Sequence, residues 1–307
     1  MEIDQIQKRL LKEVADLDSI PVGAYNIRAD GRSVGRASSA NIEITPQEGR
    51  PGINIYIKDG TVNESVHIPV IMEMSGLKDM VYNDFYVGEN CDVTIVAGCG
   101  IHNCGTGDMT HDGIHTFYVG KNSKVTYAEK HFAEGDGRAK RFMNPTTVVH
   151  LAEGASMTMD TAQIAGIDDT NRSTEADLAA GATLTIHERI LTTGDQLAHS
   201  NFRVDLNGDD SSANVVSHSV ARGRSEQELI AHMVGNARCA GHTECDSIIM
   251  DEANVTASPQ LTAVNVDASL VHEAAIGKIA GDQLIKLMTL GLTEKEAEEQ
   301  IINGFLA

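Results

Sequence analysis

Four segments of the sequence repeat one plan: FYVGENCDVTI (85–95), FYVGKNSKVTY (117–127), VVHLAEGASMTM (148–159) and DLAAGATLTI (177–186). Each has a short alternating run, a turn of small residues and a second short run, and the turns follow at intervals of 32, 32 and 27 residues. A strand-only repeat of this length is typical of a coiled sheet, whose neighbouring coils satisfy each other's backbone hydrogen bonds. The repeat predicts a mainly β fold, a right-handed parallel β-helix or coiled β-solenoid. A β-sandwich is the alternative, but its strand spacing does not require a recurring turn sequence.

Alternating runs extend the predicted solenoid in both directions. Between Asn41 and Met74, strands are separated by Gly, Pro and Asn turns. Residues 237–279 read ARCAGHTECDSIIMDEANVTASPQLTAVNVDASLVHEAAIGKI, which again alternates in short runs broken by turn residues. Residues 225–228 (SEQE) also fit a capping box that opens a helix, but the strand pattern on both sides favours a strand. The predicted β-helix core domain therefore spans residues 41–278.

Helices are predicted at both ends of the chain. Residues 3–17 place apolar side chains at three- and four-residue steps, which indicates an amphipathic helix in an N-terminal helical segment, 1–40. In the C-terminal segment, 279–307, one helix ends near Gly291 and a capping box in residues 293–296 (TEKE) opens a second. Packing on the solenoid and binding a partner remain open for both segments.

Composition excludes several classes of partner. Lys and Arg total 24 against 44 Asp and Glu, so the formal charge of −20 repels phosphate backbones and argues against nucleic acid. The N-terminus lacks a basic stretch followed by an apolar core, and no apolar run reaches the roughly 18 residues of a membrane span. Five cysteines without an export signal predict reduced thiols in a cytoplasmic protein. A GxxxxGK[ST] motif is also absent, so no nucleotide is expected on this chain.

Two groups of residues have chemistry of their own. The first is Cys99-x-x-His102-x-Cys104, followed by His111 and His115, which offers zinc ligands although the spacing fits no closed structural zinc pattern. Glycines around these residues indicate a loop. A zinc site in this segment remains one possibility.

The second group lies in the last predicted strands and consists of Cys245 and the pair His272-Glu273, with Cys239 as a weaker member. Thiols, imidazole and carboxylate on a strand-rich scaffold can hold a soft metal or a sulfur species. Structural roles also fit, since cysteine often packs as a small buried hydrophobe. The HEAAI run is not a metalloprotease motif, because HExxH requires a histidine where Ile276 stands.

The run CDSIIMDEANVTASPQL (245–261), followed by HEAAIGKI (272–279) and a two-helix tail, resembles the SufB/SufD family of iron–sulfur cluster assembly scaffold proteins. The resemblance continues from about Tyr82 to the C-terminus. It implies a non-catalytic scaffold that accepts sulfur and iron, carries a transient iron–sulfur cluster and works with a separate ABC-type ATPase subunit. The ATPase contact of the family corresponds to the C-terminal segment 279–307.

The resemblance also implies roles for particular residues. Cys99, in an Ala-Gly-Cys run, matches the position that receives persulfide sulfur from a sulfur-donor protein. His272 and Glu273 match a His-Glu pair at the inter-subunit face, where they would be metal ligands for the nascent cluster. A homodimer fits a chain that has both features, and a heterodimer with a paralogous scaffold is the alternative.

One departure from the family is clear. The best-known SufB proteins have a cysteine nine residues after the cysteine of CDS, and Asn254 occupies that position here. Either Cys245 or Cys239 replaces the missing thiol as a cluster ligand, or the protein is a supporting subunit of the SufD kind. Two other functions stay open: a cytosolic zinc-binding β-solenoid protein using residues 99–115, and a β-helical polysaccharide hydrolase or lyase. The scarcity of aromatic residues, 4%, counts against the last.

Overall fold

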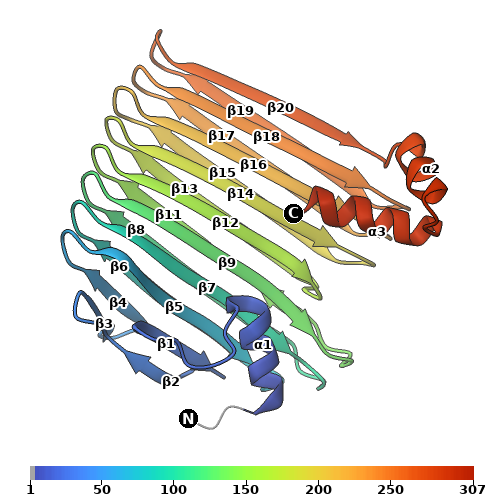
Figure 1. Cartoon of the computed structure of the whole chain (residues 1–307), viewed down its shortest axis with the longest axis horizontal. Helices are drawn as coiled ribbons and strands as arrows, with labels where there is room; N and C mark the ends of the chain where they lie inside the picture. The colour runs from blue at the N-terminus through green and yellow to red at the C-terminus, as the bar shows by residue number, and fades with distance from the viewer. Residues whose placement is uncertain (1–3) are drawn as a thin grey trace.

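The computed structural model describes residues 4–307, and over these residues it has three helices and twenty strands. The elements, labelled in Figure 1 where there is room, are α1 (Gln5–Ala15), β1 (Ala24–Ala29), β2 (Arg32–Ala37), β3 (Ile42–Pro46), β4 (Gly52–Ile57), β5 (Val62–Met72), β6 (Lys78–Val87), β7 (Asp92–His102), β8 (Met109–Val119), β9 (Lys124–Glu134), β10 (Arg141–Met143), β11 (Thr146–Leu151), β12 (Ser156–Ala165), β13 (Asp169–Leu178), β14 (Thr183–Thr192), β15 (Leu197–Leu206), β16 (Ser212–Ala221), β17 (Glu226–Gly235), β18 (Ala240–Ile249), β19 (Asn254–Ala263), β20 (Ser269–Gly277), α2 (Gly281–Thr289) and α3 (Glu294–Phe305).

From β4 onward, successive strands alternate between two sheets, except that β10 and β11 both belong to sheet B. Sheet A has the order β2-β1-β5-β7-β9-β12-β14-β16-β18-β20, and sheet B has the order β19-β17-β15-β13-β10-β8-β6-β4-β3, with β11 also between β13 and β8. Each coil of the chain adds one strand to each sheet, and successive coils pair in parallel, as β5 does with β7 and β6 with β8. Figure 1 shows the coils stacked in one row from the N-terminus to the C-terminus. The prediction of a β-solenoid is confirmed, and the sandwich alternative is wrong.

The recurring turns explain the repeat in the sequence. Their central residues have left-handed backbone conformations: Asn90 (φ 55°), Asn122 (φ 56°), Gly154 (φ 68°) and Gly181 (φ 66°). Asparagine and glycine tolerate this conformation best. Each turn also bonds to the next coil, as when the N–H of Asn90 donates to the carbonyl of Lys121 at 2.9 Å. The sequence interval between turns is therefore the length of one coil.

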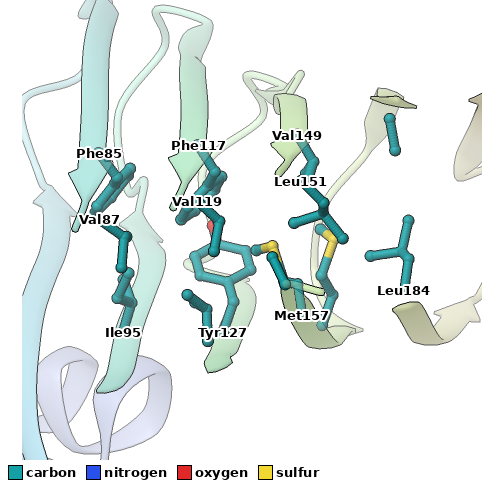
Figure 2. Packing of buried hydrophobic residues seen from close by; sticks show 14 of the residues in the cluster. Phe85, Val87, Ile95, Phe117, Val119, Tyr127, Val149, Leu151, Met157 and Leu184 are labelled. Carbon is teal, nitrogen blue, oxygen red and sulfur yellow. The ribbon is translucent and has the colours of Figure 1, made fainter. Parts of the chain in front are cut away.

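A long apolar core fills the space between the sheets, and Figure 2 shows a part of it. Equivalent residues of successive coils stack on one another: the rings of Phe85 and Phe117 are parallel, with centroids 4.3 Å apart, and Tyr127 meets Phe117 edge-on at 5.0 Å. Such aromatic pairs contribute about 0.5–1.5 kcal/mol each beyond their burial. Stacking of like residues thus holds the coils in register.

The interior also contains a row of buried polar side chains, called here the interior polar row: Asn83, His115, Tyr127, Glu129, His131, Arg172, Glu188, Ser200 and Ser217. Arg172 of sheet B reaches across to Glu129 of sheet A at 2.8 Å and lies 3.4 Å from Glu188. Two serines donate to the carboxylate of Glu188. These hydrogen bonds compensate for burying charged groups between the sheets.

The N-terminal part differs in two respects from the sequence-based expectation. Helix α1 ends two residues before the predicted end, and the predicted start, Ile3, lies outside the described residues. Strands β1 and β2 form an antiparallel hairpin within the segment predicted to be helical.

Helix α1 lies against the outer face of sheet A, where a Cβ on Gly98 would be 2.5 Å from the carbonyl of Val14. The prediction of a loop at Gly98 and Gly100 is wrong, because these glycines lie in β7 and let the helix approach the sheet.

The C-terminal tail has the two predicted helices. A capping box between Thr293 and Glu296 opens α3, and Gly291 follows α2 with a left-handed backbone (φ 98°). Helix α3 continues through Gly304 and ends at Phe305. The ambiguous run at 225–228 opens strand β17, so the preference for a strand is confirmed. No helix within residues 4–307 is long and apolar enough to cross a membrane.

Candidate metal and thiol site

The predicted pair His272-Glu273 lies on β20, the outermost strand of sheet A. Side chains of consecutive strand residues point to opposite faces. His272 pairs with the buried Thr243 of β18 and faces the interior, whereas Glu273 pairs with Glu244 and faces the outside. Within one chain the pair therefore does not form a single ligand set.

His272 is held in a way that suits a metal ligand. Its Nδ1 is 2.7 Å from the hydroxyl of Thr243, while its Nε2 is buried and has no hydrogen-bond partner among the described residues. Burial lowers the pKa of His272 from its ordinary value, which favours the neutral imidazole. When Nδ1–H donates to Thr243, the free lone pair lies on Nε2, as in histidines oriented by a second hydrogen bond for metal binding.

Cys245 shares the interior face with His272. It lies two residues after Thr243 on β18 and opposite the small side chain of Ala274 on β20. Only 4% of Cys245 is exposed, and burial raises the pKa of its thiol to about 12. The thiol is therefore protonated at neutral pH, and a bound metal ion would be needed to favour the thiolate.

A second group lies on the outer face of the same strands. Oxygen and nitrogen atoms of His242, Glu244 and Glu273 all lie within 4.8 Å of one another, and His218, Glu244 and Asp246 form a neighbouring set. Glu244 belongs to both. Imidazole and carboxylate together suit iron or zinc. Sequence reasoning missed this group, although the alternation His242-x-Glu244-x-Asp246 on a predicted strand places all three on one face.

Cys239, the weaker candidate, does not join either group. It lies six residues before Cys245, which along a strand is about 20 Å. Its side chain packs into the apolar core, and burial raises the pKa of its thiol. The structure places Cys239 in a packing role.

Cys99 faces the interior of the solenoid on β7. It is 1% exposed, packs among apolar side chains such as Val70, Met72 and Ile101, and lies beside His131 of β9. Burial raises the pKa of its thiol well above the ordinary value. The Cys99 thiol is therefore enclosed and protonated in this structure, and its role as sulfur acceptor stays a prediction.

The structure also separates the candidate zinc ligands of residues 99–115. Cys99, His111 and His115 are buried, whereas Cys104 is exposed and hydrogen-bonds His102. Among residues 4–307, the sets of three or more metal-ligating groups that converge are the two around Glu244. The segment does not assemble a zinc centre in this conformation.

Fold and site together define a class: a β-solenoid protein whose last coils present a buried thiol, an imidazole with a free nitrogen and an outer imidazole–carboxylate group. A family model described as "SUF system FeS cluster assembly, SufBD core domain" matches residues 85–305, and the chain belongs to this family.

Related proteins agree with this assignment. An iron–sulfur cluster assembly SufBD family protein of Archaeoglobus fulgidus is 28% identical over 271 residues, 86% of this chain and 71% of that protein. One from Pyrococcus horikoshii is 27% identical over 299 residues, 93% of this chain and 87% of that protein. The iron–sulfur cluster assembly protein SufB of Bacillus subtilis is 35% identical over 99 residues, 31% of this chain and 21% of that protein.

Proposed function

We propose that the protein is a scaffold that accepts iron and sulfur, holds a transient iron–sulfur cluster and passes it on. The observation that carries this proposal is the unpartnered Nε2 of His272, which lies on the same interior face of the last coils as Cys245 of the neighbouring strand. An imidazole and a thiol are suitable ligands for iron in such clusters. Glu273, Glu244 and His242 on the outer face form a second place where iron can bind before it enters the cluster.

The open end of the solenoid supports a dimer. Strands β19 and β20 end their sheets, so one side of each offers unpaired backbone groups within the described structure. Exposed apolar side chains gather at the same end, among them Leu261, Val264 and Val266. In the proposed homodimer this end meets the same end of a second copy, and a two-fold axis repeats His272 and Glu273 on both sides. A heterodimer, with a paralogous scaffold in place of the second copy, is the alternative.

The C-terminal helices are the proposed docking surface for an ABC-type ATPase subunit. Helix α2 buries none of its side chains and exposes Ile285, Met288 and, just after it, Leu290. A helix with an exposed apolar stripe is a natural ligand for a groove on a partner. The chain itself is proposed to be non-catalytic toward ATP, and hydrolysis in the partner would move the two scaffold copies and release the cluster.

Anaerobic reconstitution with ferrous iron and sulfide tests the scaffold function. The wild type should hold iron together with labile sulfide, measured by metal analysis and visible absorbance. His272→Ala and Glu273→Ala should each lower both contents. His199→Ala and Glu228→Ala change a matched His–Glu pair on strands β15 and β17 and should load like the wild type.

If a protein that has both His272→Ala and Glu273→Ala holds as much iron and sulfide as the wild type, the proposed cluster site is wrong. Stoichiometric zinc without sulfide would instead favour the zinc-binding alternative.

A further inference from the structure

Three side chains form a hydrogen-bonded chain on the outer surface of the solenoid, far from the last coils. The Sγ of Cys104 is 3.1 Å from Nε2 of His102, and Nδ1 of His102 is 3.0 Å from Oε1 of Glu134. Of the five cysteines, four are buried and Cys104 is exposed. A donor in solution can therefore reach this thiol directly.

Three separate elements fix the position of Glu134. His102 ends β7 and pairs with Glu134 at the end of β9, and Arg9 of helix α1 also bonds the Glu134 carboxylate. Burial alone would raise the pKa of Glu134, but hydrogen bonds from Arg9 and His102 hold the pKa below its ordinary value. Glu134 is thus a carboxylate that orients the His102 ring.

The turn that presents Cys104 is held on both sides. The side chain of Asn103 accepts from the N–H of Gly105 at 3.0 Å, and the hydroxyl of Ser75 accepts from the N–H of Gly107 at 3.0 Å. Because both N–H groups are already bonded, they are not free to stabilise the oxyanion of an acyl-transfer reaction. This favours chemistry at sulfur, which needs no oxyanion hole.

A thiol, a histidine and a carboxylate in this order form the nucleophile, base and orienting group of an activated cysteine. Because Glu134 accepts the proton on Nδ1, the lone pair of Nε2 faces the Cys104 thiol. We propose that Cys104 is the surface thiol that takes up sulfur from a persulfide donor, with His102 as general base and Glu134 as a positioning residue. The choice of sulfur donor as substrate rests on the proposed scaffold function.

The proposed step balances without an oxidant or reductant. The thiol of Cys104 gives its proton to His102, and the thiolate attacks the terminal sulfur of a donor R–S–SH. The donor S–S bond breaks as the bond from Cys104 to that sulfur forms, and the departing R–S⁻ takes the proton from His102. The products are Cys104–S–SH and R–SH. Soft sulfur nucleophiles react readily in such exchanges when the thiolate is accessible.

Sulfur transfer from glutathione persulfide to the full-length reduced protein tests the inference under anaerobic conditions. Peptide mass spectrometry should find one added sulfur atom on Cys104 in the wild type and in Cys99→Ser, and none on Cys104→Ser. His102→Gln should lower the initial rate by about 10²-fold, the lower range for loss of a general base.

Glu134→Gln should transfer faster than Glu134→Ala, since the amide oxygen can still accept from Nδ1–H. Thermal unfolding verifies that each variant is folded. Addition of sulfur to Cys99 of Cys104→Ser at the wild-type rate, or wild-type rates for His102→Gln, overturns the proposal.

Reconstitution with iron and free sulfide separates this inference from the scaffold function. Free sulfide bypasses the acceptor, so Cys104→Ser should load iron and sulfide like the wild type. If the wild type holds iron and sulfide but Cys104 takes up no sulfur, only the role of Cys104 fails. If Cys104 takes up sulfur but the wild type holds no iron with sulfide, only the scaffold function fails.

Discussion

Arg172 of sheet B and Glu129 of sheet A form an ion pair through the middle of the solenoid, with Nη1 2.8 Å from Oε2 and each side chain 4% exposed. The pair joins the two sheets where apolar packing is interrupted. Tyr127 donates a further hydrogen bond to Glu129 at 2.9 Å, and His131 lies 3.0 Å from Arg172. The two charges are therefore buried, and each has polar contacts besides the ion pair.

Arg172→Met is expected to lower the free energy of unfolding by about 3–5 kcal/mol, because it leaves the buried Glu129 carboxylate without its cation. Adding Glu129→Leu should recover much of this loss. Urea denaturation followed by circular dichroism measures both. Arg224→Met breaks an exposed ion pair with Asp195 and should change stability by less than about 1 kcal/mol. Equal losses for Arg172→Met and Arg224→Met would contradict a structural role for the buried pair.

Acid should destabilise the fold through His115. Its ring is buried between Asn83 and Tyr127, and burial lowers the pKa of His115 from 6.5 to about 4. The folded protein keeps the ring neutral while the unfolded chain binds a proton below its own pKa, so stability is lost as the pH falls from 6.5 to about 4. The full loss is about 3 kcal/mol.

Urea denaturation across this pH range tests the assignment. His115→Gln should be less stable than the wild type at neutral pH but should lose less stability on acidification. His199→Gln changes an exposed histidine and should keep the wild-type pH dependence. An unchanged pH dependence in His115→Gln rules out this histidine as the source.

Charged substitutions at the open end should weaken the proposed dimer. Leu261→Glu combined with Val266→Glu places like charges on both copies, and an increase in the dissociation constant of at least tenfold, about 1.4 kcal/mol, is expected. Analytical ultracentrifugation measures it. Val22→Glu is the matched control, since Val22 is 97% exposed near the opposite end and Val266 is 96% exposed. Equal dissociation constants for the variant and the control would place the interface elsewhere.

Met288→Glu on α2 should weaken binding of the ATPase subunit at least tenfold, because a carboxylate would enter an apolar contact. Calorimetric titration with the purified ATPase measures the affinity. Met80→Glu changes a methionine of similar exposure, 45% against 42%, on β6 and should bind normally. A folded chain ending at Lys278 that keeps wild-type affinity would disprove docking through the tail.

The solenoid could be predicted because its turns are local. Asparagine and glycine at left-handed positions recur at the length of one coil, and the strands between them alternate in polarity. The hairpin of β1 and β2 was missed, although Asp30-Gly31 at its turn is a strong hairpin signal. Its short strands contain arginine and glycine and resemble a loop in composition.

The site was only partly predictable. Period-2 alternation along a strand already places His272 and Glu273 on opposite faces, and it places His242 and Glu244 on the same face. Both placements could therefore be predicted from the sequence pattern. The contact between His102 and Glu134 was not predictable, since it depends on the register of β7 against β9 and the side chains are 32 residues apart. Likewise, the glycines beside Cys99 look like a loop until the position of helix α1 is known.

The two ends of the stack are unequal. At the N-terminal end, β1 with β2 and β3 with β4 pair in antiparallel fashion, so the sheets begin in a direction that the repeating coils do not continue. At the C-terminal end, β19 and β20 keep the geometry of the repeat and have no further strand beside them in residues 4–307. A stack with unpaired edge strands at one end can associate only through that end. When two copies join there, both sets of edge strands are covered, so the assembly stops at a dimer instead of growing into a fibre.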